Sequence, residues 1–222
     1  DINIKRKYSD IEKEQYDLFE AGGIFDLTDF EFTSKDLDNS VSIKNMSLEV
    51  LPHKLKIDKL LLKTGQSDLQ LNGEILNYLP YVLRNEQLNG IFILNSSYLN
   101  LDELILAYDN ASTDSTSLDS TELEAYNEVI SIPENIYFRF ESNINTLIYD
   151  SMPIKKFNGT MNIEDGKINL DQFNMQLFKG QISLNGTYFS ISNQRAKLNM
   201  ELDIKNISCL LYTSDAADEL SC

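Results

Sequence analysis

The chain has 222 residues, with 19 Lys and Arg against 35 Asp and Glu, which gives a formal net charge of −16. A chain this acidic is repelled by phosphate backbones and by anionic membrane surfaces, so its charge argues against a nucleic-acid-binding protein and against direct adhesion to acidic lipids. No apolar run reaches the roughly 18 residues that a membrane-spanning helix needs, so the sequence predicts no transmembrane segment.

The two ends of the chain differ from its middle. The chain starts at Asp1 without an initiator Met, so we expect a fragment of a longer protein, and its charged first 20 residues predict a strand edge or a short helix. Residues 209–222 break the alternating pattern and resemble an in-frame translation of a sequencing adapter, with a genuine tail as the alternative. Both cysteines, Cys209 and Cys222, lie there, so the rest of the chain predicts no disulfide and no cysteine metal site. Without the three acidic residues of this tail, the net charge becomes −13.

Apolar and polar residues alternate through most of the chain, which predicts half-buried β-strands with one apolar face. The stretch Lys54–Gly73 returns without a gap as Lys167–Gly186, 113 positions later. A shorter copy, Leu88–Leu104, matches Phe157–Phe173 at a shift of 69. Self-similarity at fixed offsets predicts one supersecondary unit that is used several times and stacked on its neighbours.

Each copy shows the same one-residue slip in its alternation. Leu55 and Ile57 share one phase, and the apolar positions that follow them are moved by one residue. An extra residue near Asp58, Asp102 or Asp171 would return the apolar side chains to one face through a β-bulge or a bend. Because repeated bulges at equivalent places curve a sheet, the sequence predicts a trough with an apolar lining.

Two segments depart from the strand pattern. Ile75–Arg84 carries apolar residues at mixed spacing around Pro80, which predicts a short helix or an ordered loop. Segment 110–125 is acidic and rich in Ser and Thr, which predicts a linker or a loop insertion with little to bury. This segment divides the chain into β-repeat regions 1–109 and 126–208, which are not independent domains if one sheet continues across it.

Turn residues separate the predicted strands of the second region. Glu164–Gly166 and Phe178–Gly180 predict hairpin turns, and residues 190–194 predict a third connection. The Asn-Gly pairs keep the phase of the strands around them, so their glycines predict a close approach or a bend and not a phosphate-binding loop. The fold class predicted from these signals is all-β, an antiparallel curved meander sheet with β-groove repeats and at most one short helix.

Residues typical of catalysis or metal binding are few. His53 is the only histidine and lies between two predicted strands, where a turn residue is expected. The acidic pairs Asp36 with Asp38 and Glu164 with Asp165 have loop and turn compositions, unlike the opposed carboxylates of a glycosidase. The acidic linker also lacks the ordered spacing of a calcium loop. The sequence therefore predicts a protein that is not an enzyme, with no catalytic residue, no metal and no cofactor.

The apolar face is the one predicted feature with functional weight. It either packs against a second sheet as a closed core or stays open as a trough that holds acyl chains, and periodicity does not separate these two readings. The candidate lipid-groove residues share a single phase on each strand of the second region: Ile136, Phe138, Phe140, Ile168, Leu170, Ile182, Leu184, Leu198, Met200 and Leu202.

A family resemblance rests on these residues. Phe157–Tyr188, with the sequence FNGTMNIEDGKINLDQFNMQLFKGQISLNGTY, resembles the C-terminal region of AsmA-like proteins, most of all those of Bacteroidetes-type bacteria. The similarity covers roughly Gly22–Ser208, with Leu88–Leu104 and Val129–Ile136 in the expected order. It implies a repeating β-groove of the AsmA and TamB type, in the periplasmic part of an inner-membrane-anchored protein of the Gram-negative envelope.

The resemblance also implies a function. Family members are thought to carry phospholipid between the inner and outer membranes or to support outer-membrane assembly. The implied partners are phospholipid acyl chains and envelope proteins, with membrane contact through parts missing from this chain. We therefore expect a non-catalytic fragment that conducts acyl chains along an apolar β-groove. The alternative is a structural or adhesin-like β-repeat module with a closed core.

Overall fold

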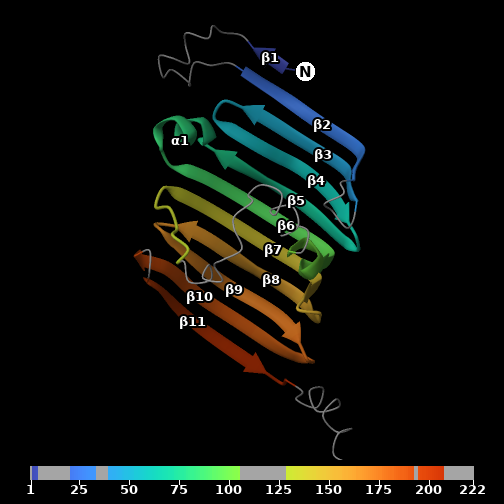
Figure 1. Ribbon diagram of the computed structural model, residues 1–222, viewed down its shortest axis with the longest axis vertical. Coiled ribbons are helices and arrows are strands. Elements are labelled where there is room, and N and C mark those ends of the chain that lie inside the picture. The colour runs from blue at the N-terminus through green and yellow to red at the C-terminus, as the bar shows by residue number, and fades with distance from the viewer. Residues whose placement is uncertain (1, 5–20, 34–39, 106–128, 193–194, 208–222) are drawn as a thin grey trace, which may run out of the picture.

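The computed structural model describes residues 2–4, 21–33, 40–105, 129–192 and 195–207. These residues form one open sheet of 11 strands, whose order in the sheet is their order in the chain (Figure 1). The all-β fold class is thereby confirmed. The predictions for most of the first 20 residues, for the linker and for the C-terminal tail fall outside the described residues.

The strands are long. The connections between neighbouring antiparallel strands are short wherever the structure describes them in full, apart from the connection that contains the helix. The first region contains β1 (Ile2–Ile4), β2 (Ala21–Phe32), β3 (Val41–Leu51), β4 (Lys54–Thr64), β5 (Ser67–Leu76), α1 (Tyr78–Arg84) and β6 (Leu88–Asn100). The second region contains β7 (Ile136–Tyr149), β8 (Met152–Glu164), β9 (Lys167–Leu177), β10 (Gly180–Ser192) and β11 (Arg195–Lys205).

The two regions belong to the same sheet, because β6 pairs with β7 over its whole length. The pairing starts at Leu88 opposite Ile136 and ends at Asn100 opposite Ile148, so the two strands are parallel. Every other neighbouring pair is antiparallel. The predicted antiparallel meander is therefore wrong at this one pair, because alternation records which face a residue occupies but not the direction of its strand.

The bulges predicted near Asp58 and Asp171 are present. Asp58 and the residue after it lie opposite the single residue Asn72. In the second copy, Asp171 and Gln172 lie opposite Asn185. Gln172 has a φ of 51°, and its N–H donates to Asn185 Oδ1 at 2.9 Å. Each bulge absorbs one residue, so the apolar side chains before and after it point to the same face.

The shorter copy, Leu88–Leu104, does not form a hairpin. Its residues Asn95–Ser97 occupy the place of the turn Glu164–Gly166 in the other copy. That turn needs Gly166, whose φ is 69°, and the shorter copy has no glycine at the equivalent position. The chain therefore continues as β6, and the amide of Ser97 donates to a carboxylate oxygen of Asp68 at 3.1 Å.

The bulge predicted near Asp102 is also absent, because the strand has already ended there. β6 stops at Asn100, and a helical turn covers residues 101–105. The carboxylate of Asp102 accepts hydrogen bonds from the amides of Asp150 and Ser151, both at 2.8 Å. Asp102 thus holds the turn between β7 and β8 and does not form a bulge that would restore the alternation of a strand.

The short helix predicted within Ile75–Arg84 is present as α1, although Leu76 still belongs to β5. Pro80 lies in the first turn of this helix, where a missing N–H costs no intrahelical hydrogen bond. Asn77 and Asn85 flank the helix in the left-handed conformation, with φ values of 62° and 56°. Asparagine tolerates this conformation better than most residues, so both ends of the helix are sharply defined.

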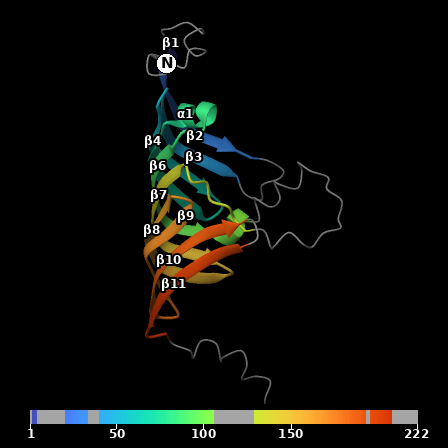
Figure 2. The same cartoon turned by 90° about the vertical axis from the view of Figure 1, so that its left-hand side faces the viewer.

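Seen from the side, the sheet is a single curved layer (Figure 2). The helical turn after β6 lies on its concave side, where Leu101 and Leu104 pack against Leu99, Ile144 and Leu147. Those last three are the only buried hydrophobic residues in the described part of the chain. The core is therefore a small cluster near one end of the central strands.

Glycines of the Asn-Gly pairs lie next to phenylalanine rings of a neighbouring strand. A Cβ atom on Gly90 would come within 2.5 Å of the Phe138 ring, and one on Gly159 within 2.6 Å of the Phe173 ring. Gly73 stands in the same relation to a phenylalanine of β6. A ring thus occupies the space that a side chain would fill at these three glycines. At Gly186, where the phase kept through Leu184–Tyr188 predicts a close approach or a bend, a Cβ atom would lie 3.3 Å from the carbonyl oxygen of Asn199 and 3.8 Å from Leu170 Cδ1.

Replacement of Gly159 by Ala should lower the free energy of unfolding by about 1 to 3 kcal/mol, because the new methyl group displaces the Phe173 ring. Gly186→Ala is the matched control, since its nearest side-chain atom is Leu170 Cδ1 at 3.8 Å. Urea denaturation of both variants checks this difference. Equal losses at the two positions would contradict the role given to the phenylalanine.

Candidate functional site

The concave side of the sheet carries continuous rows of apolar side chains. Residues directly opposite each other in a ladder share a face. Phe140 lies opposite Met161, which lies opposite Leu170, and the row continues through Gly186 to Met200. One row thus crosses five strands from β7 to β11 without a polar side chain.

The structure brings all the predicted groove residues to this surface, which we call the apolar face. Leu184 lies opposite Leu202 on β11, and Ile182 keeps the phase of Leu184 on β10. Ile136 keeps the phase of Phe138 on β7. The predicted residues on the apolar face are Ile136, Phe138, Phe140, Ile168, Leu170, Ile182, Leu184, Leu198, Met200 and Leu202.

The first region extends the same face, and the candidate residues named from sequence omitted it. Phe25 lies opposite Leu48, and Leu48 lies opposite Ile57. The alternation of β4, with its phase slip, carries the signal for this extension. Residues of the first region on the apolar face include Phe25, Leu27, Phe30, Phe32, Ile43, Met46, Leu48, Val50, Leu55, Ile57, Leu60, Leu62, Leu69 and Leu71.

Much of the apolar face has no second layer over it. Phe25 is 51% exposed near one edge of the sheet, and Leu198 and Met200 are each 58% exposed at the other. Between the edges, side chains are partly covered by their neighbours in the same layer. Domains normally bury such a face against another sheet or against helices. Among the described residues, only the helical turn after β6 and the segment before β7 contribute to a cover.

The segment before β7 reaches across one end of the face. The hydroxyl of Tyr188 donates to the carbonyl oxygen of Ile130 at 2.9 Å. Asn135 anchors the end of this segment, because its side-chain amide donates to the carbonyl oxygen of Asn85 at 3.2 Å and its own carbonyl accepts from the amide of Leu88. These contacts place the segment at the strand ends, beside the rows of apolar residues.

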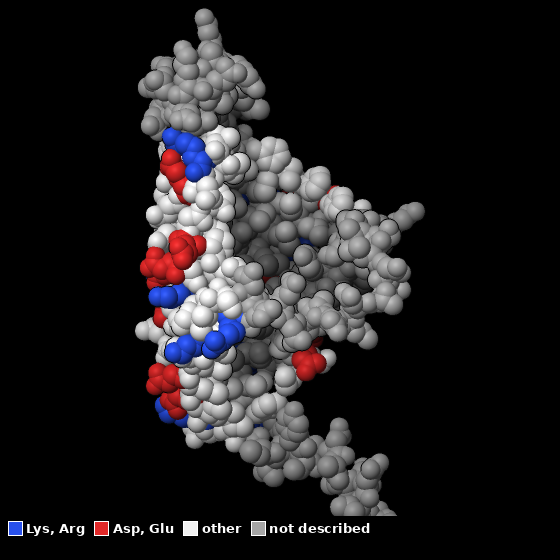
Figure 3. Space-filling model, turned by 60° about the vertical axis from the view of Figure 1, so that its left-hand side comes forward, with Lys and Arg blue, Asp and Glu red and all other residues white. Residues whose placement is uncertain are grey.

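Charged residues occupy the opposite, convex side. None of the residues of β7–β11 on the apolar face is charged, whereas Arg139 and Glu141 form an ion pair on the convex side at 2.8 Å. Lys56 pairs with Asp58 at 2.5 Å, and this hydrogen bond raises the pKa of Lys56. Figure 3 shows Lys, Arg, Asp and Glu gathered along this side of the molecule. Alternation with period two therefore separates charge from apolar surface.

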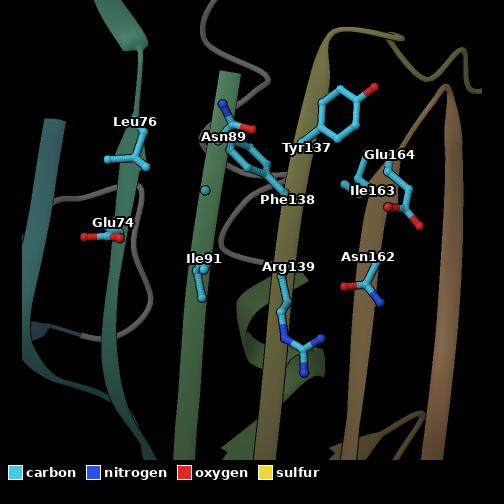
Figure 4. Close-up of a pocket in the computed structure, with 11 residues that line it drawn as sticks. Glu74, Leu76, Asn89, Ile91, Tyr137, Phe138, Arg139, Asn162, Ile163 and Glu164 are labelled. Carbon is cyan, nitrogen blue, oxygen red and sulfur yellow. The ribbon is translucent and has the colours of Figure 1, made fainter. Parts of the chain in front are cut away.

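The convex side holds a shallow pocket of about 240 Å³ over β5 to β8 (Figure 4). Its carboxylates include Glu74 on β5 and Glu164 on β8, with Arg139 and Asn162 between them. Strands are spaced about 4.8 Å apart, so β5 and β8 lie roughly 14 Å apart. The paired carboxylates of glycosidases are separated by about 5 to 9.5 Å. These two glutamates are therefore poorly placed to work as an acid–base pair.

The other residues weighed for chemistry hold turns. The carbonyl of His53 accepts an amide hydrogen bond at 2.8 Å. The hydroxyl of Tyr137 donates to Asp165 Oδ1 at 2.5 Å, and this bond raises the pKa of Tyr137. Asp36 and Asp38 lie outside the described residues. Within the part of the chain that the structure describes, no group of three or more His, Cys, Asp or Glu is arranged to hold a metal ion.

No family model, no curated protein and no solved structure matches this chain. The class of protein is therefore defined by the fold and the site together, as an open, single-layer β-sheet with an apolar concave face. The helices in the described ranges are all too short or too polar to cross a membrane.

An acidic side chain on the apolar face should be tolerated where the face is open. We expect Leu184→Asp to stay folded and to lose about 1 to 2 kcal/mol, because Leu184 is only partly buried. Ile144→Asp is the comparison, since Ile144 is 5% exposed within the core cluster, and it should lose about 4 kcal/mol or more. Circular dichroism with urea titration measures both, and unfolding of Leu184→Asp would mean that the face is a closed core.

Proposed function

We propose that this chain is a non-catalytic lipid-binding β-groove that holds phospholipid acyl chains on its concave face. The observation that supports the proposal is the uncovered apolar face of an 11-stranded sheet, where Leu99, Ile144 and Leu147 are the only buried hydrophobic residues in the described part of the chain. Large exposed apolar surfaces mark sites that bind other apolar partners. An open face of this extent therefore favours a ligand over a second protein layer.

The chemistry of the face matches a hydrocarbon chain. Its rows run across the strands, from Phe140 to Met200 in the second region, so an extended chain can lie along the trough. Each methylene transferred from water to such a surface contributes about 0.8 kcal/mol, and a few per repeat give reversible holding. Apolar contacts are non-directional, so they retain a chain without fixing its position. A charged headgroup would stay at the rim, because burial without a partner is unfavourable.

The AsmA-like class is proposed on the sequence resemblance. The repeated unit supports it, because the hairpins β4–β5 and β9–β10 contain the same bulge at equivalent residues, Asp58 and Asp171. In this reading the groove belongs to the periplasmic part of an inner-membrane-anchored envelope protein and conducts phospholipid in support of outer-membrane assembly. The alternative is a structural or adhesin-like module, in which a partner layer covers the apolar face and no lipid binds.

Tryptophan fluorescence tests lipid binding at a chosen place, because the chain contains no Trp of its own. Met200→Trp places the reporter on the apolar face of β11, where the side chain is 58% exposed. Asn199→Trp places it on the convex side of the same strand as a matched control. Vesicles of phosphatidylcholine brominated on its acyl chains should quench the first reporter strongly and the second weakly.

Three outcomes decide between the readings. Selective quenching of Met200→Trp supports acyl chains on the apolar face. Equal quenching of both reporters indicates non-specific contact with the bilayer and contradicts a groove. Absence of quenching at both positions, with both variants folded by circular dichroism, favours the structural module.

A further inference from the structure

The last strand, β11, leaves one long edge of the sheet open. All eleven of its residues are exposed, and among the described strands it pairs with β10 alone. No residue between Arg195 and Lys205 has a positive φ, and its pairing with β10 is uninterrupted from Ala196 to Lys205. Unpaired backbone N–H and C=O groups on such an edge are a template for another strand.

The opposite edge is protected by features that β11 lacks. Strand β1 covers the first residues of β2, from Ala21 to Gly23. Farther along β2, Asp29 has a φ of 49°, and its carboxylate pairs with Lys44 at 3.3 Å. Irregular backbone of this kind discourages pairing with a further strand. The edge suited to a partner strand is therefore β11.

The charged side chains Lys197 and Glu201 of β11 have no charged partner across the ladder on β10. Lys197 lies opposite Phe189 on β10, and Glu201 lies opposite Asn185. Arg195 likewise lies opposite a serine. Among the described residues, neither Lys197 nor Glu201 belongs to an ion pair. Asp203 pairs with Lys205 of the same strand, and both side chains are more than half exposed, so Lys197 and Glu201 are the charges left available for a partner.

We propose that β11 pairs antiparallel with β11 of a second copy of this chain. With Asn199 opposite its own counterpart, Lys197 of each copy lies opposite Glu201 of the other, and Arg195 lies opposite Asp203. Both contacts occur twice, because a two-fold axis perpendicular to the sheet relates the copies. Opposite charges placed directly across a ladder stabilise its register.

Neighbouring registers are less favourable. Sliding the copies until Met200 lies opposite itself brings Arg195 against Lys205, which offsets the pairing of Lys197 with Asp203, and a further step brings Glu201 against Glu201. Sliding in the other direction, until Leu198 lies opposite itself, leaves only the pairing of Arg195 with Glu201. Displacement by a single residue sets the apolar side chains of one strand against the charged side chains of the other. The sequence of β11 therefore selects one pairing with itself, which keeps the two apolar faces on the same side.

The pairing joins two sheets of 11 strands into one continuous sheet. Leu198 of one copy would lie opposite Met200 of the other, so the apolar face would run across the junction. These two side chains are each 58% exposed in the single chain and would be partly covered in the dimer. The inference does not rest on lipid binding, because every contact it uses is between protein groups.

Sedimentation equilibrium of the full chain, without lipid, tests the proposal. We expect a concentration-dependent dimer whose Kd rises with salt, since its specific contacts are exposed ion pairs. Lys197→Glu should weaken the dimer about tenfold, because it creates two like-charge contacts with Glu201. Glu201→Lys should do the same. The double variant Lys197→Glu with Glu201→Lys should restore the original Kd, because the two charges are exchanged.

Each alternative result overturns the proposal. A monomer at every concentration excludes the pairing. A dimer that neither single variant weakens would be held through another surface, such as the two apolar faces. Failure of the double variant to recover the dimer, with all variants folded by circular dichroism, rejects the register. Open-ended polymers would show that β11 pairs with β2 of the next copy instead.

Discussion

The structure depends on one constraint, which is that every strand must present its apolar residues to the same side of the sheet. In a strand with period two, a single inserted residue moves all later side chains to the other face. Here the slips in β4 and β9 are absorbed by bulges at Asp58 and Asp171, so the phase is recovered within each strand. The curvature of the sheet follows from the same bulges, and a curved sheet with one apolar side forms a trough.

Polar side chains on the convex side maintain these irregularities. Asn185 accepts the amide that the bulge at Gln172 leaves unpaired, and Asp68 does the same for Ser97. Each such hydrogen bond contributes about 0.5 to 1.5 kcal/mol, so these side chains stabilise the irregular backbone. Polar side chains such as Asp68 and Asn185 therefore have a structural role on the convex side, whereas the apolar face of β7–β11 carries no charge.

Sequence reasoning was reliable where a residue type determines a local conformation. Glycine in Glu164–Gly166 predicted a hairpin that exists, and the Asn-Gly pairs predicted close approach between strands. The bulge predicted near Asp102 is absent, because the similarity of the shorter copy to Phe157–Phe173 does not extend to its structure. Asn95–Ser97 has no glycine for the turn. Alternation also placed the groove residues on one face without showing whether another layer covers them. The three-dimensional structure was needed to show how exposed this face is, and also to show that β7 runs parallel to β6.

The parallel pair β6–β7 has a consequence for how the chain folds. From β2 to β11, the other neighbouring strands pair through comparatively local connections, whereas Leu88 meets Ile136 across 48 positions. Contacts between residues far apart in sequence are entropically slow to form, and they dominate the time needed for folding. We therefore expect the hairpins of each region to form before this one seam closes. An uninterrupted trough then depends on a single long-range pairing at its middle.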